Sequence, residues 1–111
     1  MIGPDVDLAG VSEVMRLLAD LTRLRLLMVL SEGERNVSAL VERTGYEQPS
    51  VSHHLGILRR GRVVLARRSG KEVYYRLADA SGAPAGTLCI AAGAGLTVRI
   101  EPRAASEQAA G

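Results

Sequence analysis

The segment Gln48–Arg60 reads QPSVSHHLGILRR and has the residue spacing of a short amphipathic helix. At about 3.6 residues per turn, one side of this helix carries an inward-facing stripe made of Val51, His54, Leu55 and Leu58. The opposite side carries small, polar or basic residues, namely Pro49, His53, Gly56 and Arg60, with Ser50 and Ser52 on the flanks. Such a face packs poorly against a protein core. It suits a nucleic-acid groove, because small side chains allow close approach and hydroxyl and imidazole groups can reach base edges.

Positive charge is concentrated around this segment. Residues 48–77 contain seven Arg and Lys residues and one Glu, which gives this segment a net charge of +6. Because the whole chain carries +2, the remaining residues carry a net charge of −4. Charge segregated in this way favours a polyanionic partner. From charge alone, a basic surface without a binding role remains the alternative.

Length and composition bound the class of protein. With 111 residues, of which 47% are hydrophobic, the chain predicts one domain. It has no Trp and no Phe, so the core must be aliphatic. No apolar run could span a bilayer and no basic-then-apolar leader is present, so we expect a cytoplasmic protein without membrane contact. The single cysteine, Cys89, excludes an intrachain disulfide and agrees with a reducing compartment.

Three further helices are predicted before this segment. Helical spacing favours the first over residues 11–19. The second is expected to run through Leu30 with Asp20 as its N-cap, and Gly33 lies just beyond it. The third fits Ser38–Thr44, capped by Ser38 and closed by Gly45.

The third helix, a tight connection and the segment Gln48–Arg60 predict a helix-turn-helix, whose second helix reads the major groove. Pro49 is acceptable in the first turn of that second helix. From the helices alone, an unrelated pair of short helices is an equally good interpretation. Two strand-like runs, residues 63–68 and 72–77, then flank Ser69 and Gly70 and predict a β-hairpin. A hairpin directly after a helix-turn-helix is a wing, so we predict a mainly α fold with a β-hairpin wing.

Three stretches in order carry a resemblance to a known family: LADLTRLRLL at 18–27, SVSHHLGILR at 50–59 and GKEVYYRL at 70–77. Together they resemble the ArsR/SmtB family of bacterial winged-helix repressors over about residues 12–78. The resemblance implies a homodimer that binds a near-palindromic operator in double-stranded DNA. By the family's pattern His54 faces inward, and the residues near bases or phosphates are Gln48, Ser50, Ser52 and His53.

Further site residues follow from charge and position. We expect the basic residues at the end of the recognition helix and on the wing to neutralise phosphates: Arg59, Arg60, Arg67, Arg68, Lys71 and Arg76. We expect the dimer interface to use apolar residues of the first helix and one from the C-terminal segment: Val11, Val14, Met15, Leu18 and Leu88.

The usual metal ligands of the resembled family are missing. Its metal-sensing branch commonly has a Cys-x-Cys pair where this chain has Asn36 and Ser38, and no histidine follows His54 for the other common site. His53 and His54 would project about 100° apart on a helix, so they are not expected to chelate one ion. We therefore expect no metal or cofactor in this chain.

How a signal reaches the protein is left open by the sequence. A separate metal-sensing protein, with nickel as its metal, is favoured slightly over a small ligand at the dimer interface or constitutive action. Two other classes remain: a direct metal sensor using residues such as Asp5, Asp7, His54 or Cys89, and a winged-helix protein-interaction module. An enzyme is not expected, because no nucleophile–base or carboxylate pair has a plausible spacing.

The two ends of the chain and one joint depart from the family's pattern. We divide the chain into an arm at residues 1–10, a DNA-binding domain at 11–78 and an Ala- and Gly-rich segment at 79–111. In that last segment a short dimerisation helix is expected at 87–92, a strand at 96–100 and a flexible tail after Pro102. Gly61 and Arg62 reverse the family's usual order, in which Gly directly precedes the wing, so the helix-to-wing joint is expected to differ.

Overall fold

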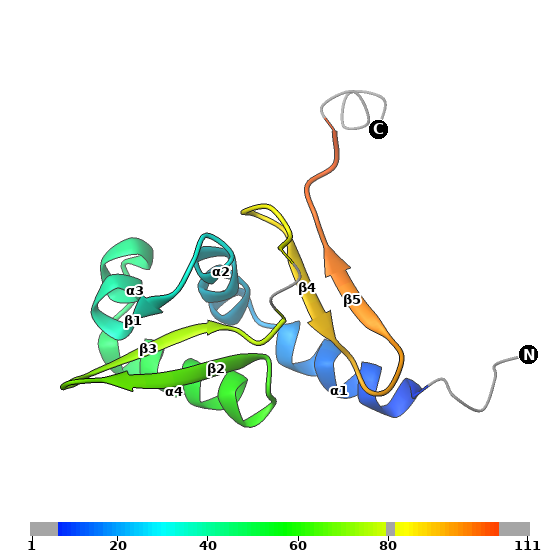
Figure 1. Cartoon of the computed structure of the whole chain (residues 1–111), viewed down its shortest axis with the longest axis horizontal. Coiled ribbons are helices and arrows are strands. Elements are labelled where there is room, and N and C mark those ends of the chain that lie inside the picture. Colours follow the sequence, from blue (N-terminus) through cyan, green and yellow to red (C-terminus); the bar gives the residue numbers. More distant parts are fainter. Residues whose placement is uncertain (1–6, 80–81, 105–111) are drawn as a thin grey trace, which may run out of the picture.

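The computed structural model describes residues 7–79 and 82–104. Along this part of the chain the elements are α1 (Leu8–Leu18), α2 (Leu21–Leu30), β1 (Arg35–Asn36), α3 (Val37–Thr44), α4 (Gln48–Arg60), β2 (Val64–Ser69), β3 (Glu72–Leu77), β4 (Leu88–Ala91) and β5 (Thr97–Ile100). Figure 1 shows the helices α2 to α4 and the β2–β3 hairpin on one side, with α1 and the β4–β5 hairpin on the other. None of the helices in the described ranges is long and apolar enough to cross a membrane.

Helix α1 begins earlier than the sequence predicted. The side chain of Asp7 accepts a hydrogen bond from the backbone N–H of Gly10 at 2.9 Å, and this N-cap starts the helix at Leu8. The start predicted at residue 11 is therefore wrong, and the last residues assigned to the arm are helical. Ala19 follows the helix as its C-cap. Residues 1–6 of the predicted arm lie outside the described residues.

The caps of α2 and α3 decide where these helices begin. Asp20 caps α2 as predicted, since its carboxylate accepts from the backbone N–H of Arg23 at 3.0 Å. For α3 the predicted cap is wrong: Asn36, not Ser38, accepts from the backbone N–H of Ala39, at 2.8 Å. Gly45 ends α3 at φ 77°, the left-handed conformation that favours glycine, as predicted.

The core is aliphatic and centres on α2, α3 and α4. Its largest fully buried side chains are Leu26, Leu27, Leu40, Leu55, Leu58, Leu88, Val51 and Val64. Three of these belong to α4, so the apolar stripe of this helix anchors it to the rest of the domain. Burying a Leu or Val side chain contributes about 1.5–3 kcal/mol relative to leaving it exposed.

The β2–β3 hairpin is the predicted wing. It is antiparallel in a register that runs from Val64 opposite Leu77 to Ser69 opposite Glu72, and Gly70 takes φ 63° in its turn. The short strand β1, which the sequence did not predict, pairs with β3, so the sheet order is β1-β3-β2. The winged helix-turn-helix fold expected from the sequence is thus confirmed.

The joint between α4 and the wing is strained where the family's pattern is reversed. Arg62 has φ 61°, the one non-glycine residue with positive φ in the described part of the chain. Gly61 has an ordinary φ of −79°, but a Cβ on it would overlap the side chain of Leu17. Glycine at position 61 therefore allows the chain to pack closely against α1. The next position has the left-handed conformation, and an arginine occupies it.

The C-terminal segment forms a hairpin instead of a helix. Strand β4 pairs antiparallel with β5, with Leu88 opposite Ile100 and Ala91 opposite Thr97. The helix predicted at 87–92 is therefore wrong, while the strand predicted at 96–100 is confirmed. Gly93 and Gly95, which weaken a helix, take φ 64° and 79° between the two strands. The predicted flexible tail falls largely on residues 105–111, outside the described residues.

Candidate nucleic-acid interface

Helix α4 exposes the face that the helical wheel predicted. Exposed side chains on it are Gln48, Pro49, Ser52, His53, Arg59 and Arg60, while Ser50 is half-buried. Val51, Leu55 and Leu58 are buried on the other side. The predicted base-reading residues thus lie on or beside one exposed polar face, and their contact with DNA stays a prediction.

His54 packs inward, as predicted, and joins a polar cluster between α2 and α4. Its side chain is 17% exposed, and its Nδ1 lies 3.3 Å from a guanidinium nitrogen of Arg23 and 4.0 Å from the carboxylate of Asp20. A guanidinium can only donate, so in this contact Nδ1 of His54 is the acceptor side. Arg23 also donates to the carbonyl of Leu17 at 2.7 Å. The cluster therefore ties the recognition helix to the start of α2.

The same cluster shapes the ionisation of Asp20. The hydrogen bond from the backbone N–H of Arg23 is the main reason that the pKa of the Asp20 carboxyl lies below its ordinary value, and the nearby positive charge of Arg23 acts in the same direction. The rings of His53 and His54 meet edge-on with centroids 5.3 Å apart. One histidine is exposed and the other is half-buried, and their separate roles stay a prediction.

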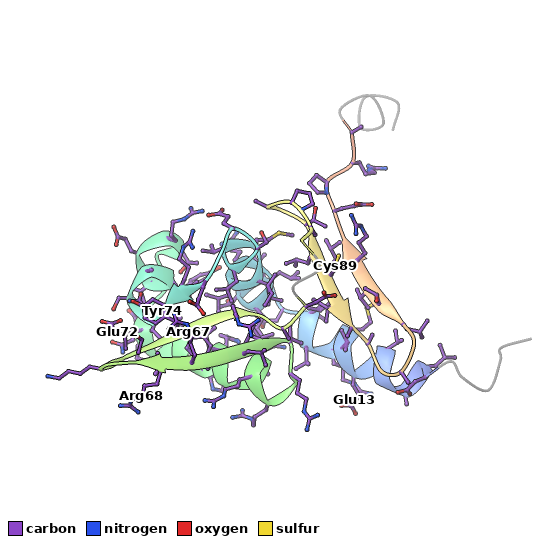
Figure 2. The ribbon with its side chains drawn as sticks, viewed as in Figure 1. Glu13, Arg67, Arg68, Glu72, Tyr74 and Cys89 are labelled. Atoms are coloured by element: carbon purple, nitrogen blue, oxygen red, sulfur yellow. The ribbon has the colours of Figure 1, made fainter. Side chains whose placement is uncertain are left out.

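The wing presents its two adjacent arginines to opposite faces of the sheet. Arg67 forms a forked ion pair with Glu34, with Nε and Nη2 at 2.9 and 2.6 Å from Oε1, and stacks 4.8 Å above the ring of Tyr74. Within the part of the chain that the structure describes, Arg68 makes a single hydrogen bond, from Nε to the carbonyl of Gly70 at 3.4 Å. Figure 2 shows Arg67 on the side of Tyr74 and Arg68 on the other side of the strand.

This pairing divides the predicted phosphate contacts into two groups. Arg59, Arg60, Arg68 and Lys71 are exposed and make no ion pair among the described residues. Arg67 is already paired, and its hydrogen bond to Glu34 is the main reason that the pKa of Glu34 lies below its ordinary value, with the charges of Arg67 and Arg76 acting in the same direction. The first group is therefore better placed to meet phosphate oxygens than Arg67.

The recognition helix and the wing tip adjoin at a recess of about 260 Å³. It is lined by Val37, Ser38, Gln48, Lys71, Glu72 and Val73. A hydroxyl, an amide and an ammonium group thus line one recess between α3, α4 and the wing. The sequence reasoning did not assign Ser38 to this interface, because it placed the residue at a helix cap.

Glu34 and Asn36 are the other residues that the sequence reasoning missed. Asn36 donates from its amide to the carboxylate of Glu72 at 2.5 Å, and Glu34 holds Arg67. Their partners lie 36 and 33 residues away in the sequence. No local pattern signals such pairs, since they depend on the pairing of β1 with β3.

Comparisons with known proteins agree with this geometry. Residues 20–64 match a family model described as the bacterial regulatory protein, arsR family. The HTH-type transcriptional regulator KmtR of Mycobacterium tuberculosis is 46% identical over 74 residues, which cover 67% of this chain and 57% of KmtR. Among solved structures, the transcriptional repressor BigR from Xylella fastidiosa is similar with a TM-score of 0.63 and 36% identity, covering 67% of this chain and 76% of BigR. The chain belongs to the ArsR family.

A second solved structure adds the assembly state of a relative. It is the homodimeric winged helix-turn-helix DNA-binding domain Mb0332 from Mycobacterium bovis, described as a possible ArsR-family regulator, with a TM-score of 0.62 and 36% identity over 73% of this chain and 79% of that one. The present ArsR-family chain spans only 57% of the length of KmtR, a curated relative that it matches. The names of these relatives describe regulators and repressors, not enzymes, in agreement with the prediction.

The side chains expected at an ArsR-family dimer interface have different exposures. Val14 and Leu18 are 7% and 5% exposed and pack into the core, and Val11 is half-buried. Leu88 is fully buried inside its own chain. Met15 is 50% exposed and Leu8 is 52% exposed. Leu8 lies within residues 1–10, which the sequence assigned to the N-terminal arm. The exposed apolar surface of α1 is therefore made chiefly by Met15 and Leu8.

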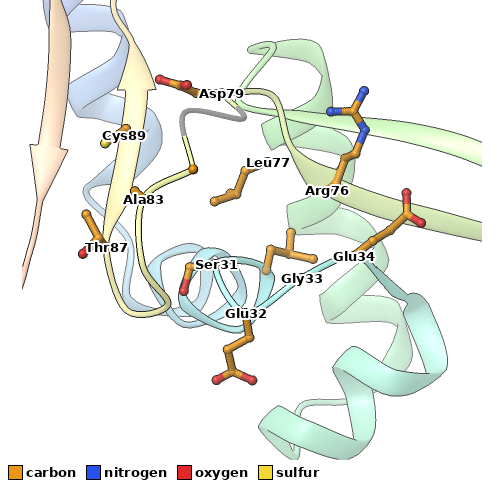
Figure 3. A pocket seen from close by; sticks show the side chains of 12 residues that line it. Ser31, Glu32, Gly33, Glu34, Arg76, Leu77, Asp79, Ala83, Thr87 and Cys89 are labelled. Carbon is orange, nitrogen blue, oxygen red and sulfur yellow. The ribbon is translucent and has the colours of Figure 1, made fainter.

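Metal and ligand chemistry is limited in the described part of this ArsR-family chain. No group of three or more His, Cys, Asp or Glu side chains there could hold a metal ion. A pocket of about 310 Å³ lies between the end of α2, β3 and β4. Figure 3 shows Asp79, Thr87 and Cys89 among the residues that line it. The sulfur of Cys89 lies 3.3 Å from a guanidinium nitrogen of Arg99. The rim carboxylates Glu32 and Glu34 already pair with arginines.

Proposed function

We propose that this chain is a DNA-binding transcriptional repressor that acts in the cytoplasm as a homodimer on an inverted-repeat operator. The observation that carries the proposal is the exposed face of α4, which carries His53, Ser52 and Gln48, with Gln48 lining one recess together with Lys71 of the wing tip. Hydroxyl, amide and imidazole groups can read base edges in the major groove, whereas Arg and Lys neutralise phosphates.

Binding to DNA can be measured by fluorescence anisotropy with two labelled duplexes of equal length. One contains the site that footprinting locates in the promoter of the gene encoding this protein, and the other has a random sequence. We expect tighter binding to the promoter. Affinity should also fall with salt by about 0.9 log unit per log unit of salt for each phosphate contact. Equal affinity for both duplexes would contradict sequence-specific binding and favour a protein-interaction module.

The homodimer proposal rests on the exposed apolar residues of α1 and on the homodimeric relative from Mycobacterium bovis. A two-fold dimer places its recognition helices about one turn of DNA apart, which requires an inverted repeat. Replacing Met15 by Glu should shift the mass measured by light scattering towards the monomer and weaken operator binding. Glu13→Gln, an exposed change on the same helix, is the matched control.

For the signal, we propose a separate metal-sensing protein, with nickel as the first metal to test. The missing ligand sets of the metal-sensing branch motivate this proposal. Calorimetric titration of the chain alone with nickel, zinc and cobalt should give no stoichiometric binding that weakens operator affinity. Tight binding of that kind would favour the direct metal sensor instead.

A further inference from the structure

Arg67 differs from the other cations of the wing in the number of groups that hold it. The Nε and Nη2 donors on one edge of its guanidinium meet the carboxylate of Glu34, and its Cζ lies 4.8 Å from the centroid of the Tyr74 ring. Because of Glu34, the pKa of Arg67 is raised above its ordinary value. A forked guanidinium–carboxylate pair has a fixed geometry, which a lysine could not reproduce.

We propose that Glu34 is a positioning residue for DNA binding, which acts through Arg67 to fix the wing, and that Arg67 itself does not contact phosphate. The inference rests on the proposed function. It assigns a DNA-binding role to a negatively charged residue that would be expected, by charge alone, to oppose binding.

The order of the strands explains what this pair achieves. In the sheet order β1-β3-β2, β2 is the outer strand of the wing and pairs only with β3 in the described chain. Glu34 directly precedes β1 on the opposite side of the sheet. Its ion pair with Arg67 therefore spans β3 and links the outer strand to the body of the domain. The Asn36–Glu72 hydrogen bond adds a second link, from β1 to the start of β3.

The alternation of side chains along β2 transmits this constraint to Arg68. Residues directly opposite each other share a face, so Arg67 lies with Tyr74, whereas Arg68 lies on the face of Ala66 and Tyr75. Tyr75 packs against the core. Holding Arg67 on the outer face therefore directs Arg68 towards the side of the sheet that faces the body of the domain.

The sign of one substitution distinguishes positioning from direct contact. If Glu34 positions the wing, Glu34→Gln should weaken operator binding by about two- to fivefold, the range expected for loss of one exposed ion pair. If Arg67 instead binds phosphate, Glu34→Gln releases it and removes a negative charge, so binding should strengthen.

Glu32→Gln is the matched control. Glu32 is also paired with arginines, closely with Arg43 on α3 and at 3.7 Å with Arg35 on β1, neither of which belongs to the β2–β3 hairpin. Its removal deletes the same charge and should leave binding unchanged or slightly stronger. Weakening by both variants to the same extent would overturn the proposal, because the effect would not depend on the wing.

A double-mutant cycle and the salt slope complete the test. Arg67→Ala, Glu34→Ala and the double variant should lose similar affinity, and all three should keep the salt slope of the unaltered protein. Arg67→Lys should resemble Arg67→Ala, because charge without the fork cannot hold Glu34 in the same way. A slope flattened by about 0.9 in Arg67→Ala, with Arg67→Lys restoring it, would overturn the proposal.

A DNA-free measurement separates this inference from the proposed function. Hydrogen exchange of the amides at residues 68–71 should quicken in Glu34→Gln and not in Glu32→Gln. If the unaltered protein shows no preference for its promoter, the proposed function fails, and a quickened exchange still supports the fixing of the wing by Glu34. Unchanged exchange in Glu34→Gln would overturn that fixing whatever the DNA result.

Discussion

The recognition helix α4 and the C-terminal β4–β5 hairpin both bury aliphatic side chains, but they differ in what determines their structure. In α4 the buried residues Val51, Leu55 and Leu58 follow helical spacing within one segment. In the hairpin, Leu88 and Ile90 are buried, and the conformation depends on a glycine turn and on pairing with β5. The comparison teaches that local periodicity determines the helix, whereas contacts between separate segments determine the hairpin.

The largest expected effect comes from the anchor of α4. Leu55→Ala should lower the free energy of unfolding by about 2–5 kcal/mol, because it removes a fully buried side chain and leaves a cavity. Chemical denaturation monitored by circular dichroism measures this loss. Ser52→Ala, an exposed change one turn away, is the control and should alter stability little. A small effect of Leu55→Ala would contradict the central place of α4 in the core.

The turn of the hairpin should be sensitive to one glycine. Gly93 has φ 64°, and a Cβ on it would overlap the carboxylate of Asp7, the N-cap of α1. Gly93→Ala should therefore cost about 1–3 kcal/mol through backbone strain and displacement of that cap. Thermal unfolding measures the loss.

The matched control for the hairpin turn lies in the wing. Gly70 has a similar φ of 63°, but a Cβ on it would meet nothing within 4 Å, so Gly70→Ala carries the backbone strain alone. Gly93→Ala should be the more destabilising of the two. Equal losses would mean that the contact between the hairpin turn and Asp7 adds nothing to stability.

Substitutions in α4 and in the β4–β5 hairpin should differ most clearly in their effect on DNA binding. His53→Ala should weaken binding to the operator by about 1–2 kcal/mol and leave binding to random DNA and the unfolding free energy nearly unchanged, since the side chain is exposed. Thr97→Ala, an exposed change in β5, should affect neither duplex. Competition anisotropy provides the measurement. Equal losses on both duplexes for His53→Ala would assign the histidine to phosphate contact.

The difference between the two regions also explains how far the sequence could predict this protein. Helical spacing, Asp20 as a cap and the β-rich runs around Gly70 predicted the winged helix-turn-helix, since each signal lies within about one turn or one hairpin. The same helical spacing also predicted which face of α4 is exposed. These predictions needed no knowledge of distant contacts.

The misses share a dependence on residues far apart in the chain. The Arg67–Glu34 pair could not be predicted, because strand β1 has two residues and no strand signal of its own. The glycines at 93 and 95 were interpreted as weak points of a helix, although in the folded chain they form a turn that the pairing of β4 with β5 requires. The caps Asp7 and Asn36 were missed for a smaller reason, since several polar residues near each helix start could serve.

The smallest effect on the free energy of unfolding is expected at the joint between α4 and the wing. Unlike the other substitutions, this one should stabilise the protein. Arg62 has φ 61°, a conformation that disfavours a residue with a Cβ. Arg62→Gly should therefore raise the free energy of unfolding by about 0.5–1 kcal/mol relative to Arg62→Ala, which removes the same charge but keeps the strain. Thermal unfolding of the pair gives the difference. If the alanine variant were the more stable, the joint would relax without strain, and the reversed order of Gly61 and Arg62 would carry no energetic penalty.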